Sequence, residues 1–388
     1  MRTLLLILSL FTLQSVAQQQ DIETGASQLA SNPLLSPVAL TGKHIGLVVN
    51  QSSVSGKSHL LDELLRQGFA VQKIFSPEHG FRGTADAGAT VANSIDPQTG
   101  IPVWSLYGKH KKPTAAALHG INLLIFDLQD VGVRYYTYLS TLHYVMEAAA
   151  EQNIPLLVLD RPNPNGTYVD GPVLDKNYQS FVGLHPIPLL HGMTLGELAL
   201  MIKGERWIHK AEQLELYVWP VKNYQRDRPY DVPVRPSPNL PNAQAVALYP
   251  SLGFFEATPL SVGRGTDFPF QVLGYTNPPL GAFAFSPVAK AGAALNPPLK
   301  NQLVLGLDLR DVKAGGLDLS YLLQAQQVFA KHKLKLFNSP DFMDKLSGTN
   351  QLRQQIEQGW SEAQIRQSWQ ADLQKFRQQR RPYLLYPE

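Results

Sequence analysis

A carboxylate and an imidazole stand side by side in residues 76–83, which read SPEHGFRG. Glu78 and His79 lie between a proline and a glycine, and Arg82 follows three residues later. A carboxylic acid enclosed in a dry cleft can stay protonated and act as a general acid, and neighbouring charges tune that state. The alternative for so short a motif is a surface turn with solvated charges. The stretch therefore indicates acid–base chemistry only if other functional loops gather around it.

Residues 127–138 (DLQDVGVRYYTY) combine two carboxylates, a guanidinium and three tyrosines. The acids are Asp127 and Asp130, and Arg134 and Tyr135 follow them. Carboxylates bind sugar hydroxyls, and aromatic rings pack against the C–H faces of sugars. This composition is therefore typical of a carbohydrate site. In the alternative interpretation, Arg134 pairs with one of the acids and the tyrosines are packing residues.

Four other segments carry amide or guanidinium groups in loops or at the ends of apolar runs. These segments hold five residues: Asn50, Asn163 in residues 160–166, Arg235 and Asn239 in residues 235–241, and Arg264 in residues 261–267. Thr194 and Glu197 have the spacing of a helix capping box, which predicts a structural role for Glu197. The chain contains no GxSxG, SxxK, HExxH, GxGxxG or P-loop motif, so it offers no serine nucleophile, zinc site or nucleotide site to name.

Short apolar segments alternate with helical ones in the first half of the chain. We predict buried strands at residues 44–50, 69–75, 122–127 and 155–160, and helices at residues 58–67 and 141–152. This alternation indicates a parallel sheet covered by helices. Ligands of such sheets bind beyond the carboxyl ends of the strands, where the polar loops named above begin. Ordinary helix caps and turns are the alternative for each loop alone, but several in register favour a shared cleft.

The second half of the chain has a different pattern. A proline-dense segment spans residues 229–241, strand-like runs occupy residues 214–220 and 303–309, and amphipathic helices are predicted at residues 317–332 and 350–380. We therefore predict an α/β protein with a Rossmann-like parallel-sheet domain at residues 40–228 and a smaller α+β domain at residues 229–388.

Residues 1–17 have the features of a secretory signal peptide: an early arginine, an apolar run, and small residues before the expected cleavage near Ala17. The apolar run is shorter than the ~20 residues of a membrane span, so we expect no membrane anchor. Residues 18–39 are predicted as a leader segment. The chain has no cysteine, which excludes thiol catalysis and suits an oxidising compartment. We therefore expect a periplasmic or secreted protein.

The charge balance bears on possible partners. The 388 residues include 34 Lys+Arg and 31 Asp+Glu, a formal charge of +3. Such a weak and evenly spread charge does not favour nucleic acid or a membrane surface as a partner. The oligomeric state is left open.

Taken together, the motifs resemble those of the NamZ-type exo-β-N-acetylmuramidases, a family of bacterial glycoside hydrolases. The matching blocks run in one order over nearly all of the chain: GLVVNQSSV (46–54), FSPEHGFRG (75–83), SLYG (105–108), DLQDVGVRYYTY (127–138), DRPNPNG (160–166), HGMTLGEL (191–198), RPSPNLP (235–241) and SVGRGTDFPF (261–270). The resemblance implies an active site in the cleft between the two domains, no cofactor, and Glu78 as the catalytic glutamate. The implied substrates are peptidoglycan-derived disaccharides or short glycans, from which a non-reducing terminal N-acetylmuramic acid is released.

A mechanism follows as a hypothesis. Glu78 would protonate the glycosidic oxygen, with His79 and Arg82 tuning its charge. For a second carboxylate, Asp130 is the first choice and Asp127 the second, with Asp160 and Asp267 behind them. A separation of about 5–5.5 Å from Glu78 would mean a retaining route and about 6.5–9.5 Å an inverting one. The substrate's own acetamido group is a third possible nucleophile.

Muramic acid carries a lactyl carboxylate, so its recognition calls for a cation. Arg134 and Arg264 are the favoured candidates, ahead of Arg161 and Arg235. Hydroxyl and acetamide partners are expected among Asn50, Asn163 and Asn239, and sugar stacking on Tyr107, Tyr135 or Tyr138. Two other functions fit the same residues: a periplasmic sugar-binding protein without turnover, and an amidase or esterase acting on the stem peptide.

Overall fold

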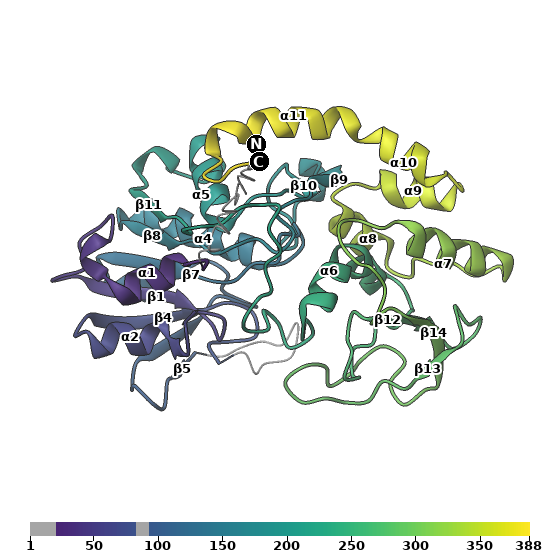
Figure 1. Cartoon of the computed structure of the whole chain (residues 1–388), viewed down its shortest axis with the longest axis horizontal. Helices are drawn as coiled ribbons and strands as arrows, with labels where there is room; N and C mark the ends of the chain where they lie inside the picture. Colours follow the sequence, from purple (N-terminus) through teal and green to yellow (C-terminus); the bar gives the residue numbers. More distant parts are fainter. Residues whose placement is uncertain (1–20, 83–92) are drawn as a thin grey trace, which may run out of the picture.

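The computed structural model describes residues 21–82 and 93–388 (Figure 1). The predicted signal peptide lies outside this range. The first lobe is built on a seven-stranded sheet with the order β11-β8-β7-β1-β4-β6-β5. Its parallel strands are β1 (His44–Val49), β4 (Ala70–Ser76), β6 (Pro102–Ser105), β7 (Leu123–Asp127), β8 (Leu156–Leu159) and β11 (Leu216–Trp219), and β5 (Ser94–Ile95) pairs antiparallel with β6. The predicted parallel sheet is confirmed.

Helices cover both faces of this sheet because its strands are apolar on both sides. In β1, Ile45 and Leu47 pack with the helices α1 (Gly25–Ser31) and α2 (Leu60–Arg66), whereas Val48 faces α4 (Tyr138–Gln152) and α5 (Leu195–Gly204). The short α3 (Ala115–Leu118) follows β6. The predicted capping box is also confirmed, since Thr194 and Glu197 bond each other's backbone N–H groups at the start of α5.

Two small hairpins complete the first lobe. Strands β2 (Val54–Ser55) and β3 (Ser58–His59) pair antiparallel, as do β9 (Asp170–Val173) and β10 (Pro188–Leu190). The order of the main sheet reverses at β1: the chain passes from β1 to β4 and β6 on one side, and then to β7, β8 and β11 on the other. Such a reversal opens a crevice at the carboxyl ends of the central strands, which is where Asn50, Glu78 and Asp130 begin their loops.

The second lobe holds a three-stranded antiparallel sheet of β12 (Val272–Tyr275), β14 (Val304–Asp308) and β13 (Phe283–Phe285). Beside it in Figure 1 lie α6 (Ala243–Leu252), α7 (Ser320–Lys331) and α8 (Pro340–Ser347). The single helix predicted at residues 350–380 is wrong: the segment forms α9 (Gln351–Glu357), α10 (Glu362–Ser368) and α11 (Gln370–Arg380). Gly359, in the left-handed region at φ 75°, follows α9, and Ser361 caps α10, so both residues interrupt the helix.

The C-terminal segment returns to the first lobe. Helix α11 runs across the top of Figure 1, and the chain then ends against the sheet lobe. There the Tyr386 hydroxyl donates to Asp160, which in turn accepts hydrogen bonds from Thr194 and the Gly196 N–H at the start of α5. Asp160 is therefore fully engaged in holding α5 and the C-terminus.

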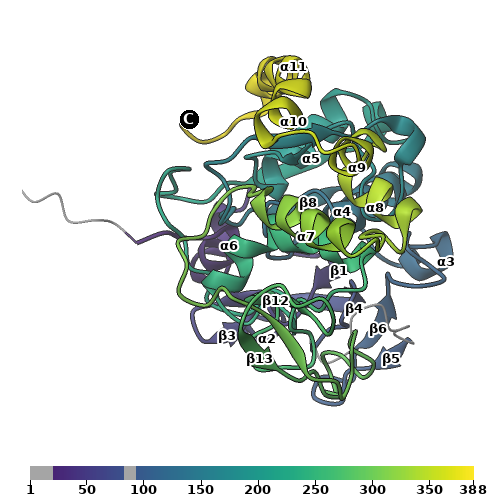
Figure 2. The same ribbon diagram turned by 90° about the vertical axis from the view of Figure 1, so that its right-hand side faces the viewer.

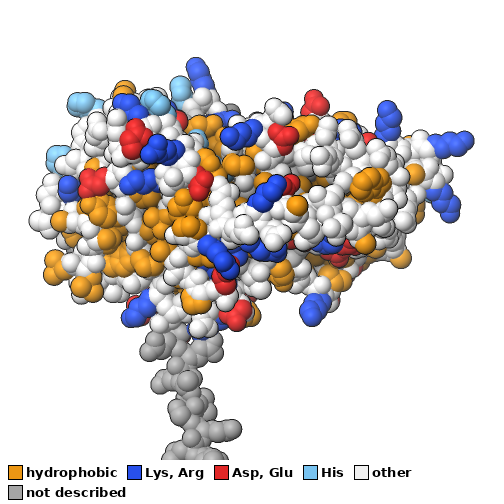
Figure 3. Space-filling view, turned by 90° about the horizontal axis from the view of Figure 1, so that it is seen from above, with side chains coloured by type: hydrophobic (Ala, Val, Ile, Leu, Met, Phe, Trp, Pro, Cys, Tyr) orange, Lys and Arg blue, Asp and Glu red, His pale blue; other side chains and the backbone are white. Residues whose placement is uncertain are grey.

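One apolar core joins the two lobes. The cluster that contains Leu142 and Leu198 of the first lobe continues through Phe254 to Leu273 and Phe329 of the second. In Figure 2, which views the molecule from the side of the second lobe, the helices of this lobe lie in front of the sheet lobe. On the face seen in Figure 3, Lys and Arg side chains are interspersed with Asp and Glu, and hydrophobic side chains gather over the sheet lobe. Within the described ranges, no helix is both long and apolar enough to cross a membrane.

Candidate active site

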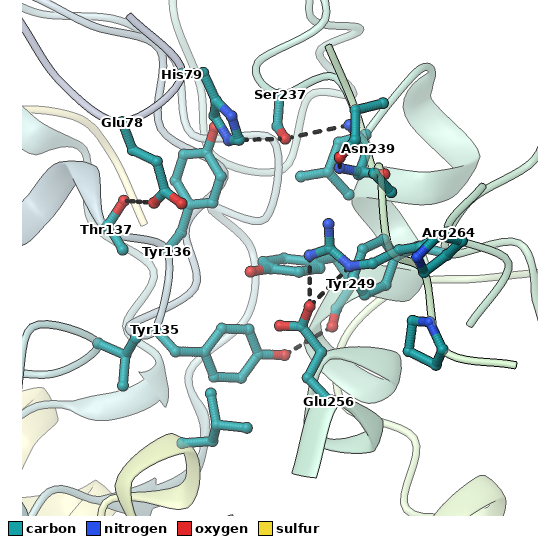
Figure 4. A pocket seen from close by; sticks show the side chains of 18 of the residues that line it. Glu78, His79, Tyr135, Tyr136, Thr137, Ser237, Asn239, Tyr249, Glu256 and Arg264 are labelled. Atoms are coloured by element: carbon teal, nitrogen blue, oxygen red, sulfur yellow. Dashed lines mark hydrogen bonds and ion pairs between the residues drawn. The ribbon is translucent and has the colours of Figure 1, made fainter. Parts of the chain in front are cut away.

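A cavity of about 680 Å³ lies between the loops that follow β4 and β7 and the facing segments of the second lobe (Figure 4). It is large enough for a sugar residue with its substituents. The first lobe contributes Glu78, His79, Tyr107, Tyr135, Tyr136, Thr137, Tyr138 and Val182, and the rest of the chain contributes Ser237, Asn239, Leu240, Tyr249, Glu256, Arg264, Phe270, the loop 293–298, Phe342 and Leu346.

Glu78 occupies the sheet-lobe wall of this cavity, two residues after the end of β4. Its Oε2 accepts a hydrogen bond of 2.9 Å from the Thr137 hydroxyl, and its carboxyl also bonds with the Tyr107 side chain. Burial, together with the Glu78 charge, raises the pKa of Tyr107, so the phenol keeps its proton. Two neighbouring side chains therefore hold the Glu78 carboxyl in place at the cavity surface.

His79 lies beside Glu78 but is turned toward the second lobe (Figure 4). The backbone reaches the left-handed region at His79 (φ 70°) and Gly80 (φ 74°), a tight turn that directs the two neighbouring side chains apart. The His79 Nε2 lies 3.3 Å from the Ser237 hydroxyl oxygen, which accepts from the Asn239 N–H. His79 therefore links the Glu78 loop to the proline-rich segment.

The opposite wall carries an ion pair. Arg264 donates through Nε (3.0 Å) and Nη2 to a single oxygen, Oε1, of Glu256, and its guanidinium lies 5.0 Å from the centre of the Phe270 ring. Glu256 belongs to the short 3-10 helix Gly253–Ala257, which directly follows α6. The remaining Arg264 nitrogen, Nη1, projects into the cavity (Figure 4) and forms no hydrogen bond with the described residues.

The tyrosine hydroxyls tie the two lobes together. Tyr135 donates to the carbonyls of Tyr249 (2.7 Å) and Pro250, whereas Tyr136 and Tyr138 both donate to the carbonyl of Pro236. The rings are left to form the cavity wall. Burial raises the pKa of each of these tyrosines, so they remain neutral at physiological pH.

Asn239 is buried at the edge of the cavity with half of its amide unused. Its Nδ2 donates to the Ala293 carbonyl (2.9 Å), whereas its Oδ1 is buried without a hydrogen-bond partner among the described residues. Because an unpaired buried acceptor costs about 1–3 kcal/mol, such a group in a cavity wall is a place for a ligand donor.

Several of the expected site residues lie behind the cavity instead. Asp127 forms a two-point ion pair with Arg161, and both side chains are buried. Asp130 is also buried, and its Oδ2 accepts from the Gly132 N–H at 2.7 Å while Oδ1 has no partner within the described chain. Burial raises the pKa of the Asp130 carboxyl to about 7. Neither acid lines the cavity.

The structure corrects the expected positions of Arg134, Asn163 and Asn50. The Arg134 guanidinium points into the interior and donates to the carbonyls of Pro172, Ile187 and Leu346. Asn163 bonds its own loop and the Met193 carbonyl. Asn50 donates to the Tyr138 hydroxyl (2.7 Å), so it supports a cavity tyrosine from below. All three side chains satisfy polar groups of the fold.

Two arginines stand outside the cavity. Arg82 pairs with Asp96, and Arg235 is exposed. Of the predicted site residues, Glu78, His79, Tyr135, Asn239 and Arg264 are thus brought together. We assigned no role to four other parts of the cavity lining: Glu256, Thr137, Ser237 and the loop 293–298. The first three lie in or next to the sequence blocks named above, whereas the loop has no motif that could have revealed it.

Within the described residues, no group of three or more His, Cys, Asp or Glu side chains is placed to hold a metal ion. Of the described residues that line the cavity, Glu78 and Glu256 carry carboxylates. They stand on facing walls, with a cation attached to the second. This arrangement can supply a proton at one wall and bind an anion at the other.

Comparison with known proteins identifies the family. The model "Exo-beta-N-acetylmuramidase NamZ, N-terminal" matches residues 45–244 and its C-terminal counterpart matches residues 247–386. The chain is 38% identical to the peptidoglycan beta-N-acetylmuramidase NamZ of Bacillus subtilis (strain 168), over 95% of this chain and 92% of that protein.

Solved structures agree. A DUF1343 family protein from Bacteroides fragilis NCTC 9343 superposes with a TM-score of 0.85 at 43% identity, over 95% of this chain and 100% of that one. A second DUF1343 family protein from the same organism superposes with a TM-score of 0.81 at 30% identity, over 94% of this chain and 99% of that one. The two family models meet within α6. The chain belongs to the NamZ family of exo-β-N-acetylmuramidases.

Proposed function

We propose that this protein is an exo-acting glycoside hydrolase that releases β-linked N-acetylmuramic acid from the non-reducing ends of peptidoglycan fragments. The family assignment supports the reaction class. The observation that carries the proposal to the level of residues is the placement of Glu78 and Arg264 on facing walls of one tyrosine-lined cavity. Muramyl glycosides present a scissile oxygen and a carboxylate on the same sugar, and these two walls offer a partner for each.

Glu78 is the proposed general acid. As the bond between the anomeric carbon and the glycosidic oxygen breaks, its carboxyl proton passes to that oxygen, and the leaving sugar departs as an alcohol. Thr137 and Tyr107 hold the carboxyl, and His79 connects its loop to Ser237. In the second half of the reaction, the Glu78 carboxylate takes a proton from the water that attacks the anomeric carbon.

The substrate's acetamido oxygen is the proposed nucleophile. Asp130 and Asp127, our first and second choices from the sequence, lie behind the cavity wall, and Glu256 is engaged by Arg264. A change of the Asn239 side-chain rotamer would bring its buried, unpaired Oδ1 to the cavity surface, where it can accept the acetamide N–H and so orient the carbonyl oxygen toward the anomeric carbon. Attack by this oxygen gives a cyclic oxazolinium, and water then opens it with overall retention.

Arg264 is the proposed reader of the lactyl carboxylate. Glu256 holds the Nε and Nη2 edge of the guanidinium through one oxygen, which leaves Nη1 to face the substrate. Phe270 fixes the plane of the group from the side. A hydrogen bond between a guanidinium and a carboxylate in a partly enclosed site is among the stronger polar contacts in proteins.

The test is the release of muramic acid from a β-muramyl-(1→4)-N-acetylglucosamine disaccharide by the wild type and by Glu78→Gln. We expect release by the wild type and a loss of at least a thousandfold in kcat for the variant. Full activity in Glu78→Gln would remove Glu78 as the acid, and binding without turnover by the wild type would show a sugar-binding protein. Product from peptide-bearing fragments alone would show an amidase or esterase.

The anomeric form of the first product tests the nucleophile. Proton NMR during hydrolysis should show the β-anomer, whereas the α-anomer would exclude the acetamide route. Azide separates the two retaining routes. If added azide restored turnover by Glu256→Gln and the product were a muramyl azide, Glu256 would be a covalent nucleophile. That result would overturn the role of the acetamide.

We further propose that the protein is exported by the predicted signal peptide and acts in the periplasm or outside the cell. A peptidoglycan-processing reaction and the absence of cysteine support this location. N-terminal sequencing of the protein recovered from the extracytoplasmic fraction should find a chain that begins at Gln18. Retention of residues 1–17 in a cytoplasmic pool would contradict the proposal.

A further inference from the structure

Three aromatic rings extend outward from the cavity on the side of Glu78. Tyr107 lines the cavity, the Phe181 ring lies 5.8 Å from it, and the Tyr144 ring lies 6.3 Å beyond Phe181 with only 16° between the two ring planes. Val182, next to Phe181 in sequence, also lines the cavity. All three rings are half-buried, so each keeps part of its surface in contact with solvent. We call these three residues the aromatic shelf.

The rings come from three separate segments. Tyr107 follows β6, Tyr144 projects from the second turn of α4, and Phe181 lies in the connection between β9 and β10. Packing in a core would explain such convergence if the rings were fully enclosed. They are instead only half-buried, and they continue the cavity wall, so the cluster has the features of a binding surface.

A cation lies on the shelf. The Lys111 Nζ is 4.5 Å from the centre of the Phe181 ring. The adjacent Lys112 is held by Glu147 and Glu151, whereas Lys111 forms no ion pair within the described part of the chain. Its ammonium group is thus a donor positioned beside an apolar surface, a combination that suits a neutral polyhydroxy ligand.

The half-buried rings of the shelf mark the more exposed end of the cavity. Tyr135 and Tyr249 are only 2% and 8% exposed and are held by hydrogen bonds between the lobes, so they form its closed end. An exo-acting enzyme places the terminal sugar in the closed end, and the remainder of the glycan then leaves through the open end. The acid that protonates the glycosidic oxygen stands between the two. Tyr107, which bonds Glu78, is therefore the first ring on the leaving-group side.

We propose that Tyr107, Phe181, Tyr144 and Lys111 form a subsite for the leaving N-acetylglucosamine unit. This inference rests on the proposed function, because it assigns the part of the substrate beyond the scissile bond. The apolar face of the sugar packs on the Phe181 and Tyr144 rings, and Lys111 donates to its hydroxyl or acetamide oxygens. The subsite thereby positions the glycosidic oxygen at Glu78.

The experiment compares two substrates that share muramic acid and differ in the leaving group. One is the muramyl-glucosaminyl disaccharide and the other is methyl β-N-acetylmuraminide, whose methyl group is too small to reach the shelf. The variants are Phe181→Ala and Tyr144→Ala, neither of which touches Glu78 in the described contacts. Trp360→Ala serves as a control, because Trp360 is a partly exposed aromatic residue (38%) outside the cavity lining, on the connection between α9 and α10.

We expect each shelf variant to lower kcat/KM for the disaccharide about fivefold to tenfold, the loss of one ring–sugar contact, and to leave the methyl glycoside within about twofold of the wild type. Trp360→Ala should change neither value. Equal losses on both substrates, or no loss on the disaccharide, would overturn the subsite, since a general packing defect acts on both.

Binding measurements keep the subsite testable if turnover fails. In the Glu78→Gln background, calorimetry should show that Phe181→Ala weakens the disaccharide about fivefold to tenfold and leaves the methyl glycoside unchanged. This selective loss would support the subsite even if the wild type hydrolysed neither substrate. The lack of hydrolysis would then refute the proposed function but not the subsite. Equal dissociation constants for the disaccharide with and without Phe181 would refute the subsite alone.

Discussion

Replacement of Arg264 by glutamine should remove most of the preference for muramic acid over glucosamine. Glutamine keeps a polar side chain but is shorter than arginine and loses the charge and the guanidinium donors. In the structure, Arg264 is held by Glu256 and Phe270, and its Nη1 is directed into the cavity. The cation is thus oriented before any ligand arrives, so the lactyl carboxylate does not have to organise it.

The size of the effect follows from the setting of the contact. The Arg264 side chain is 17% exposed, which places it between a surface pair and a fully buried one. A hydrogen bond to a charged group contributes about 1.5–3 kcal/mol, whereas an exposed ion pair contributes about 0–1 kcal/mol. We therefore expect the ratio of kcat/KM for muramyl over glucosaminyl glycosides to fall about 10-fold to 100-fold, where each 1.4 kcal/mol is a factor of ten.

The assay uses methyl β-glycosides of both sugars with the wild type, Arg264→Gln and the double variant Arg264→Gln/Glu256→Gln. The double variant is needed because Arg264→Gln alone leaves the Glu256 carboxylate unpaired, and it would repel the lactyl group. Arg82→Gln is the matched control. It also breaks an arginine–carboxylate pair, with Asp96, but the Arg82 side chain is 38% exposed and lies outside the cavity lining.

A ratio that stays within twofold of the wild-type value in the double variant would refute the assignment of Arg264. A loss of the same size in Arg82→Gln would show that the effect is not specific to the cavity. Arg134, our other candidate from the sequence, is expected to behave differently: Arg134→Ala should lower the free energy of unfolding by several kcal/mol, because three buried carbonyls lose their donor.

Three further predictions concern groups around the site. Asn239→Ala should lower kcat about 10-fold to 100-fold, because it removes the acceptor oxygen. Asn239→Asp keeps an acceptor but loses the contact with Ala293, so it should retain more activity, and equal losses in the two variants would assign the effect to the loop contact. The pKa of Asp130 is about 7 in the folded state and about 4 in the unfolded state, so the folded state binds more protons between these values and stability declines as pH rises through them. From pH 5 to pH 8, urea unfolding of Asp130→Asn should show about 2.5 kcal/mol less decline than the wild type, and identical slopes would contradict a buried neutral acid. Tyr386→Phe should lower the free energy of unfolding by about 1–3 kcal/mol, because it removes the buried hydroxyl that bonds Asp160. Tyr217→Phe removes an exposed hydrogen bond to Glu215 and should lower it by less than about 0.5 kcal/mol; an equally small loss in Tyr386→Phe would show that the C-terminal contact is dispensable.

Periodicity in the sequence was sufficient to predict the sheet lobe. The apolar runs at β1, β7 and β8 are nearly continuous because both faces of a covered parallel sheet are buried, and that pattern is distinctive. The predicted helix at residues 350–380 failed for the opposite reason. Its polar and glutamine-rich character is compatible with one helix or with three, and the breaks at Gly359 and Ser361 depend on packing against α7, α8 and the first lobe.

The direction of side chains in the loops was harder to predict. In a loop at the carboxyl end of a strand, neighbouring side chains can face either the cleft or the interior. Arg134 and Tyr135 are adjacent, yet the arginine satisfies carbonyls behind the wall and the tyrosine forms the wall. Asp127 ends β7 and Asp130 follows it, but both point into the fold, one toward Arg161 and one toward the Gly132 N–H. Which side each residue faces depends on groups distant in sequence.

The division of the site between two lobes matches the chemistry of the substrate. In muramic acid, the lactyl ether is on C3 and the scissile oxygen is on C1, so the anion and the protonated atom lie on different edges of one ring. Glu78 comes from the sheet lobe and Arg264 from the other, and the hydroxyls of Tyr135, Tyr136 and Tyr138 bond main-chain carbonyls across the cleft. Since one apolar core also joins the lobes, the spacing between acid and cation is set by the fold, and a sugar without the lactyl group lacks one of its two anchors.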